Sequence, residues 1–370
     1  MSKHLPRRRV FKFSEFLTAV SIIGILSTSL RTTAQAADSR AVNTEAALSA
    51  EVRDKGWIAF SASTGRVDWD LFVMRPDGSQ RRRLTDTPQF NEAGVRFSPD
   101  GKRILYYRMP NTVAVDNNDY GKHELVIANS DGTNVVTYGN DFPWASWGPD
   151  GTQFACLDKS GIRIIDVASR RVVRQLPRRG IVEQLVWSPD GKWFAGTANG
   201  LGPFWNIGRL DTTTGAIHVA SETDRYNCTP DWMPDSRRIV YARGIVPQEG
   251  GWAELWVADG DGEKRTMRYA EEGRHIYGAC SSPDGKYLIF TRSEKDLGGA
   301  DSAGTRLTIV RWQDTPMVGG DSDKLRTKYP DARHGPRLDL CWGWEPHWTY
   351  AEIAPAAKGH GPASYEGKAE

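Results

Sequence analysis

The chain has 370 residues, of which 39% are hydrophobic, and carries 48 Lys and Arg against 46 Asp and Glu. This length and composition are those of a globular protein that can bury its own core. Six of the basic and one of the acidic residues lie in the first 36, so the remainder carries 42 positive against 45 negative charges. The remainder also has no zinc-finger spacing, aromatic RNA-binding motif or basic helix, and we therefore expect no nucleic-acid partner.

The N-terminus has the layout of an export signal. A basic stretch, "MSKHLPRRRVFKF", precedes the apolar run "FLTAVSIIGILSTSL" and the small residues "AQA" at 34–36. The apolar run is short for a membrane span, so we predict a cleaved signal peptide over residues 1–36 rather than the alternative, an uncleaved anchor. Arg8-Arg9-Val10-Phe11 resembles the twin-arginine motif, and the general secretory and twin-arginine routes both stay open. We expect a periplasmic or secreted protein with a linker over residues 37–55.

One short phrase then recurs through the chain. An aromatic residue, a Pro-Asp-Gly turn and an alternating apolar strand follow one another in "FSPDGKRILYY" from Phe97, "WGPDGTQFACL" from Trp147, "WSPDGKWFAGT" from Trp187, "WMPDSRRIVYA" from Trp232 and "SSPDGKYLIFT" from Ser281. A sixth, weaker copy is "WEPHWTYAEI" from Trp344. Proline presets the first turn position, Asp bonds its own backbone and Gly accepts a positive φ. We expect Trp147, Trp187, Trp232 and Trp344 to share one packing position between neighbouring units.

Each copy contains four short strands separated by glycine turns. Such a small antiparallel sheet cannot bury both of its faces alone, but a ring of similar sheets can. The fold class that we predict is therefore all-β, a six-bladed β-propeller over residues 56–352. "GWIAFSAS" from Gly56 is a second strand without a first, and "WGWEPHW" from Trp342 is a first strand without a complete blade. We expect these N- and C-terminal strands to share one blade and close the ring, followed by a disordered tail over residues 353–370.

The repeats "FSPDGKRILYY", "WSPDGKWFAGT" and "SSPDGKYLIFT", with "LFVMRPDGSQRRRLTD", resemble the TolB-type propeller repeat over roughly residues 56–350. The resemblance implies an exported six-bladed propeller that binds protein partners. TolB proteins carry an α/β domain ahead of the propeller, where this chain has only the predicted linker.

The segments that lead into the first strand of each blade converge on one mouth of a propeller's central channel. Their carboxylates, amides and aromatic rings are suited to binding a sugar, a peptide end or a cation, and the alternative is that they bond neighbouring blades together. The candidate ligand-binding residues at this mouth are Glu92, Asp141, Trp144, Glu183, Tyr226, Asn227, His275, Tyr277, Asp339 and Trp342.

The sequence indicates no cofactor. Some relatives of this propeller are oligogalacturonate lyases, for which several metal-binding histidines near the axis are expected, but only His275 lies in a lead-in segment here. There is no G-x-S-x-G nucleophile motif, and we assign no catalytic residue and no metal ligand. Cys156, Cys228, Cys280 and Cys341 form no CxxC pair; we expect buried free thiols, with a Cys228–Cys280 disulfide as the alternative.

These features favour an exported, non-enzymatic binding or scaffold propeller that recognises a protein or an envelope polysaccharide. The alternative is a polysaccharide lyase of the oligogalacturonate type with its active site at the channel mouth. We expect no membrane span once the signal is removed.

Overall fold

The computed structural model describes residues 45–115, 123–244, 253–293, 304–312, 316–320 and 322–354. The chain divides after Ala47, and the description concerns the unit that begins at Leu48. The predicted signal peptide, most of the tail and residues 37–44 of the linker lie outside the described residues. Within the linker, residues 48–52 are helical and the side chains of Leu48 and Val52 are buried.

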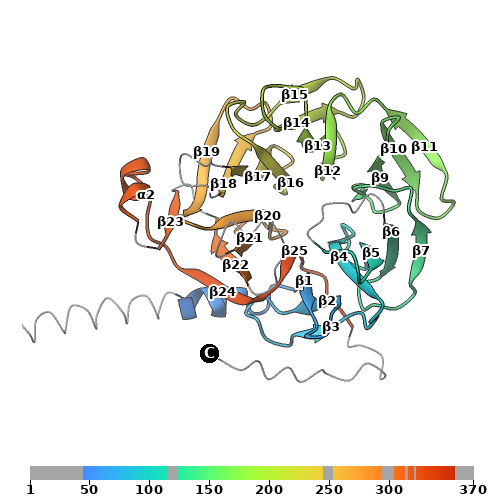
Figure 1. Cartoon of the computed structure of the whole chain (residues 1–370), viewed down its shortest axis with the longest axis horizontal. Helices are drawn as coiled ribbons and strands as arrows, with labels where there is room; N and C mark the ends of the chain where they lie inside the picture. The colour runs from blue at the N-terminus through green and yellow to red at the C-terminus, as the bar shows by residue number, and fades with distance from the viewer. Residues whose placement is uncertain are drawn as a thin grey trace, which may run out of the picture. The chain divides into compact units, whose positions relative to one another are not determined.

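Six antiparallel sheets stand side by side around a central axis (Figure 1). From the axis outward, the first sheet contains β25 (Trp344–Thr349), β1 (Trp57–Ser63), β2 (Trp69–Met74) and β3 (Arg82–Arg83), and the second contains β4 (Phe90–Phe97), β5 (Arg103–Pro110), β6 (Glu124–Asn129) and β7 (Val136–Gly139). The third contains β8 (Ser146–Trp147), β9 (Gln153–Leu157), β10 (Ile162–Asp166) and β11 (Val172–Leu176), and the fourth β12 (Ile181–Trp187), β13 (Trp193–Ala198), β14 (Asn206–Asp211) and β15 (Ile217–Val219).

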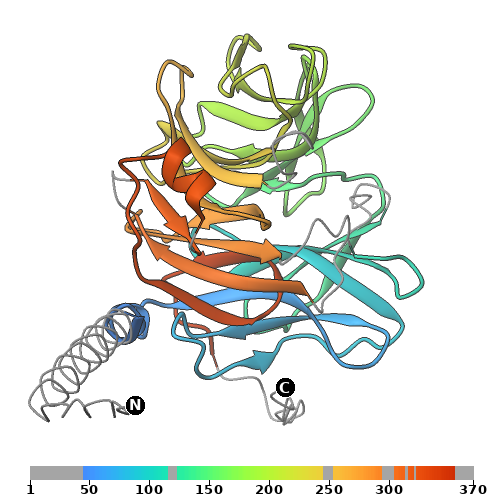
Figure 2. The ribbon, with the colours of Figure 1, turned by 60° about the vertical axis from the view of Figure 1, so that its left-hand side comes forward.

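The fifth and sixth sheets are linked at their outer edges, because the chain between the third and the outermost strand of the sixth sheet adds a strand to the fifth sheet. The fifth contains β16 (Asn227–Trp232), β17 (Arg238–Gly244), β18 (Ala253–Asp259), β19 (Arg265–Glu271) and β23 (Met317–Gly319), and the sixth β20 (His275–Ser281), β21 (Tyr287–Ser293), β22 (Thr305–Arg311) and β24 (Arg337–Trp342). β23 joins the fifth sheet in parallel, and the short helix α2 (Asp323–Lys328) follows it on the outside of the ring (Figures 1 and 2). The predicted all-β, six-bladed propeller is confirmed.

The predicted closure is also confirmed. β25 pairs antiparallel with β1, matching Trp57 with Thr349 and Ile58 with Trp348. The two backbones approach so closely at Gly56 that a Cβ there would lie 1.9 Å from the Thr349 carbonyl oxygen. The indole Nε1 of Trp348 donates a hydrogen bond of 2.7 Å to the Lys55 carbonyl oxygen. The two ends of the propeller are thus held in one blade by backbone and side-chain bonds.

The register that we predicted for the last copy is wrong by four residues. Each innermost strand has a positive-φ residue five positions before the turn proline, and in β25 that residue is Glu345. Tyr350, not Pro346, therefore stands at the turn-proline position, and Trp348, not Trp344, is the equivalent of Trp147. The error arose because β25 ends at the close of the ring, where no Pro-Asp-Gly turn is needed to connect it to a next strand.

The other turns follow the predicted chemistry. In the second sheet Ser98 Oγ bonds the Asp100 carboxylate, which accepts the Lys102 N–H, while Gly101 adopts a φ of 68°. The fifth sheet has Ser236 in place of glycine, at a φ of 56°. Its hydroxyl accepts the Asp190 N–H at 3.0 Å, so the substituted residue also ties two blades together.

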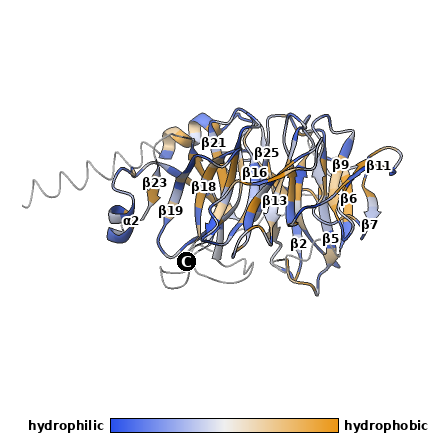
Figure 3. Ribbon diagram, turned by 90° about the horizontal axis from the view of Figure 1, so that it is seen from above, coloured by the Kyte–Doolittle hydropathy of each residue, from blue (hydrophilic) through white to orange (hydrophobic). Residues whose placement is uncertain are grey.

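The core lies between the sheets rather than within any one of them. Apolar side chains line the facing surfaces of adjacent blades, while polar residues gather at the two faces of the ring (Figure 3). The first interface packs Leu71 and Val73 against Val95 and Tyr106. Trp147 donates its indole N–H to the Arg96 carbonyl oxygen of the preceding blade at 3.1 Å. All four cysteines are free thiols, as predicted; Cys156 and Cys280 are buried, whereas Cys228 and Cys341 are only half-buried.

We predict that deleting residues 344–370 removes the cooperative unfolding transition. The deletion exposes the inner edge of β1 and opens the interface that Trp348 fills, which leaves two adjacent sheets without a partner. Thermal unfolding followed by circular dichroism measures this. Deletion of residues 355–370 alone is the control and should leave the midpoint within about 2 °C; a 344–370 deletion that melts like the full chain would contradict closure through β25.

Candidate functional site

A ring of backbone bulges surrounds the central channel. The innermost strands of the second, fourth, fifth and sixth sheets each leave two residues unpaired with the neighbouring strand at the same place. One residue per blade adopts a left-handed conformation there; the six are Gly94, Trp144, Gln184, Thr229, Gly278 and Glu345, with φ between 45° and 68°. Four of these are not glycine, and such strained positions persist only when surrounding bonds hold them.

The holding bonds run from blade to blade. Gln184 Oε1 accepts the Thr229 N–H at 2.7 Å, and Thr229 Oγ1 accepts the Gly278 N–H at 3.2 Å. Glu345 donates its N–H to Thr291 Oγ1 at 3.0 Å. The amides of Thr229, Gly278 and Glu345 are therefore satisfied by the adjacent blades, which ties these blades together.

The channel is hollow on both sides of a waist. The hollow at the mouth where the innermost strands begin is open to solvent and is lined by the six bulge residues. The hollow toward the turn prolines is also open, and its walls are formed by the aromatic and proline side chains of the repeat. Arg96 and Asp231 line both hollows, so the waist carries one positive and one acidic side chain.

The waist is electrostatically unusual. Burial raises the pKa of Asp231 to about 6, against which the Arg96 charge favours the ionised form. Burial, assisted by the same Arg96 charge, lowers the pKa of His347 to about 3. The Nδ1 atom of His347 accepts the Phe97 N–H at 3.1 Å, and the neutral ring therefore carries its proton on Nε2. His347 is thus a neutral wall residue that joins the first two blades.

Among the predicted site residues, Trp144 lines the channel hollow. Asp141 lies exposed in the segment before β8, where its carbonyl oxygen accepts a hydrogen bond from Arg163, and Glu183 and His275 are half-buried in β12 and β20. Tyr277 is half-buried against Trp344, with ring centroids 4.9 Å apart. Tyr226 is 53% exposed.

Two other predicted residues are buried. Asn227 donates from Nδ2 to the carbonyl oxygens of Trp205, Glu222 and Arg225, and so fixes the loop in front of β16. Glu92 accepts the Thr87 hydroxyl at 2.8 Å, and burial raises its pKa to about 7.

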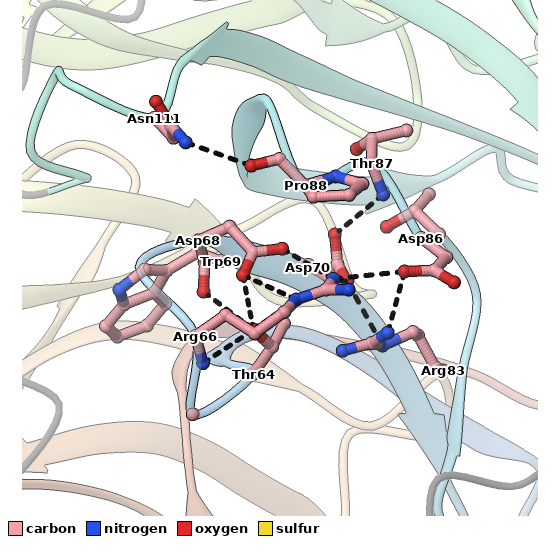
Figure 4. Close-up of polar contacts among 12 residues, drawn as sticks. Thr64, Arg66, Asp68, Trp69, Asp70, Arg83, Asp86, Thr87, Pro88 and Asn111 are labelled. Atoms are coloured by element: carbon pink, nitrogen blue, oxygen red, sulfur yellow. Dashed lines mark hydrogen bonds and ion pairs between the residues drawn. The ribbon is translucent and has the colours of Figure 1, made fainter.

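Next to Glu92, the connection between the first two blades is held by charge. The Asp70 carboxylate lies 3.1 Å from Arg83 Nε and 3.5 Å from Arg66, and both arginines also contact Asp86 (Figure 4). Burial raises the pKa of Asp70 to about 6, which the Arg83 charge opposes. These contacts connect β2 to β3 and to the start of the loop that leads to the second blade.

The placement of Asp339 and Trp342 at the first strand of the last copy is wrong. Both lie on β24, the outermost strand of the sixth sheet, because the innermost strand begins only at Trp344. Asp339 accepts hydrogen bonds from Arg292 at 3.0 Å and from Arg337 at 3.1 Å, within a network that also holds Glu271. Trp342 is 40% exposed, with the Arg306 guanidinium 4.3 Å from its ring centroid.

Sequence reasoning missed the residues that the channel hollows bring together at the waist and on the ring: Arg96, Thr229, Asp231, Glu345 and His347. The sequence did contain a signal for the waist residues. Arg96 and Asp231 lie three positions before a turn proline, and His347 lies three positions before Tyr350, which takes the place of that proline. Of the described residues, no group of three or more His, Cys, Asp or Glu side chains is arranged to hold a metal ion. The described helices include none with the length and apolar character that a membrane crossing requires.

We predict that acid destabilises the protein partly through His347. Its pKa is near 6.5 in the unfolded chain and about 3 in the folded one, so between these values the unfolded chain binds the extra proton and stability falls with falling pH. Asp231 acts in the opposite direction, since its folded pKa lies above its unfolded value.

Lowering the pH from 6.5 to 4.5 should cost the wild type about 2 kcal/mol more than His347→Asn, whose amide oxygen replaces the Nδ1 acceptor without titrating. Denaturant unfolding at the two pH values measures this difference. Equal pH dependence in the two proteins would refute the assignment.

Neither the family models nor the curated proteins that were searched match the chain. Among solved structures, TolB from Acinetobacter baumannii is similar at 16% identity and a TM-score of 0.55, covering 80% of this chain and 67% of that one. The putative TolB from Agrobacterium tumefaciens is similar at 18% identity and a TM-score of 0.50, covering 69% of this chain and 84% of that one. An oligogalacturonate lyase from Vibrio parahaemolyticus has 13% identity and a TM-score of 0.40. In fold, the chain is a TolB-like six-bladed β-propeller.

Proposed function

We propose that this protein is an exported, non-enzymatic binding or scaffold propeller that holds a protein or an envelope polysaccharide on one face of its ring. The export part of the proposal rests on the signal-like sequence of residues 1–36. The partner part is supported by the likeness to TolB propellers and by the architecture of the two faces.

The observation that carries the proposal is the difference in connection length between the two faces. On the face where the innermost strands end, the turns to the next strand span five residues each: 98–102, 148–152, 188–192, 233–237 and 282–286. On the opposite face, four of the six connections between the second and third strands are longer, over 111–123, 199–205, 245–252 and 294–304, while 64–68 and 158–161 are short. On the turn face, the long connection 312–336 leaves β22 beside the 282–286 turn and contains β23 and α2. Insertions concentrated on one face of a repeat architecture are typical of its binding face.

The long-loop face also exposes aromatic side chains. Tyr226 is 53% and Trp205 38% exposed, and Tyr226 packs edge-on against Phe204 with ring centroids 4.9 Å apart. Trp342 with Arg306 lies at the same end of the sixth sheet, because Arg306 opens β22 and Trp342 ends the antiparallel β24. Aromatic rings held by neighbours are suited to stacking on sugars and to anchoring proteins. The cluster of Phe204, Trp205 and Tyr226 is our main candidate contact and is named the aromatic rim.

We predict that Trp205→Ala with Tyr226→Ala lowers affinity for the natural partner at least tenfold, because two exposed anchors are removed. The partner is first captured from envelope extract on the wild-type protein and identified by mass spectrometry or sugar analysis, and its affinity is then measured with purified material. Val135→Ala, an exposed apolar residue at a turn of the other face, is the matched control. Unchanged binding by the aromatic-rim variant would refute this face as the site.

The same samples address the enzymatic alternative. Wild-type protein is incubated with polygalacturonate and a divalent metal, and unsaturated uronide products are followed by ultraviolet absorbance. We expect no product above the rate of a heat-denatured sample. Turnover that Asp231→Asn abolishes while the fold is retained would overturn the non-enzymatic assignment.

A further inference from the structure

The outer edge of the third blade differs from the edges of the other blades. β11 is the outermost strand of its sheet, and residues 172–175 are all exposed, with Val172 at 49% and Val173 at 51%. Two consecutive residues of a strand point to opposite sides, so both sides of this edge face solvent. The pairing of β11 with β10 is interrupted by a bulge between Val172 and Arg174. The strand presents free backbone groups beside exposed apolar side chains.

Five exposed arginines accompany this strand along its length. They are Arg170, Arg171, Arg174, Arg178 and Arg179, and we call them with β11 the arginine edge. Arg170 contacts the Thr137 carbonyl oxygen at 3.5 Å, and Arg174 contacts that of Thr213 at 3.4 Å. In the part of the chain that the structure describes, none of the five forms an ion pair with a carboxylate.

Elsewhere among the described residues, some exposed arginines form ion pairs, while single ones such as Arg81 and Arg237 do not. Arg53 contacts Asp77 at 2.9 Å and Arg326 contacts Asp323 at 3.0 Å. Asp166, four residues before the arginine edge, already accepts the backbone N–H and the hydroxyl of Ser169. Five unpaired positive charges repel one another, and an anionic partner would relieve that repulsion. Their concentration within residues 170–179 also contrasts with the slight negative charge of residues 37–370.

Of the other outer edges, three are shorter and one is covered, while the six-residue β24 of the sixth blade exposes only Trp342. β3 and β15 have two and three residues, and β7 has four. In the fifth blade the chain supplies an additional strand itself, since β23 pairs in parallel with β19 and matches Tyr269 with Met317. The propeller thus already contains one blade whose outer edge has accepted a fifth strand. Edge charges also protect strands against aggregation, and the experiment below separates the two roles.

We propose that the arginine edge is a docking strand for an extended acidic segment of a protein partner, which adds to the third blade as a fifth strand. The free backbone groups of β11 supply the pairing, and the guanidinium groups bind the partner's carboxylates. Val172 and Val173 supply apolar contact on the two sides of the added strand. This surface is the outer edge of the third blade, whereas the aromatic rim belongs to the loops before β14 and β16, so the inference goes beyond the proposed function.

The test uses a fluorescein-labelled peptide of alternating Glu and Val, seven residues long, and fluorescence anisotropy at physiological salt. The full chain should bind it, and Arg171→Gln with Arg174→Gln and Arg178→Gln should weaken binding at least tenfold. Lys102→Gln with Lys192→Gln and Lys286→Gln removes the same charge from exposed turns and should change affinity less than twofold. Equal weakening by both triple variants would overturn the proposal, as would no weakening by either.

Strand pairing is separated from charge attraction with a peptide of the same charge that is N-methylated at alternate amides. Methylation removes backbone donors, so binding should fall at least tenfold, and amides of residues 172–176 should gain hydrogen-exchange protection only with the unmethylated peptide. Equal binding of the methylated peptide, or tighter binding of polygalacturonate or anionic phospholipid vesicles, would overturn strand addition in favour of a general polyanion surface. The Trp205→Ala, Tyr226→Ala protein should bind the peptide normally, which keeps this result independent of the proposed function.

Discussion

The pairing of β25 with β1 is the constraint on which the rest of the structure depends. Each sheet buries its faces only against its two neighbours, so the six interfaces exist together or not at all. The closing blade contributes Phe60 and Trp348 to the cluster that also holds Tyr287 and Ile289 of the sixth blade and Leu48 ahead of the first strand. Closure also ties the two ends of the propeller, because Trp348 bonds Lys55 directly. A local contact between two short strands thus decides the stability of a ring of about 300 residues.

The channel is a consequence of the same closure. Holding Trp144, Gln184, Thr229 and Glu345 at positive φ costs of order 1 kcal/mol each. The compensating bonds come from adjacent blades, as between Gln184 and Thr229, so they are made only when the neighbours are in place. The bonds between blades therefore offset the backbone strain of the inner strands and fix a single geometry. In it the bulge residues line the mouth of the channel, and Arg96 and Asp231 line both hollows.

The sequence predicted the fold well because its information is local and repeated. Pro-Asp-Gly turns such as that at Asp100 depend on residues within five positions, and five near-identical copies determine the period. The last copy was misaligned because β25 is not followed by a turn, which left Pro346 as a misleading marker. The candidate site was predicted less well. Only Trp144 of the ten residues lines the hollow, since bulges that turn a side chain into or away from the channel depend on bonds to the next blade.

The polar lead-in residues show why residue type alone could not separate binding from architecture. Asn227 and Glu92 have side chains that could bind a ligand, but both are used within the protein. Asn227 donates from its amide to three carbonyl oxygens, and Glu92 accepts a hydrogen bond from Thr87 in the connection between the first two blades. The inner ring must be uniform for the blades to fit, and it therefore uses its polar groups internally. Variation is concentrated where no neighbour constrains it, in the long loops of one face and along outer edges such as β11 and β23. Recognition of a partner by this propeller is therefore expected at its loops and edges, which the uniform inner ring holds in place.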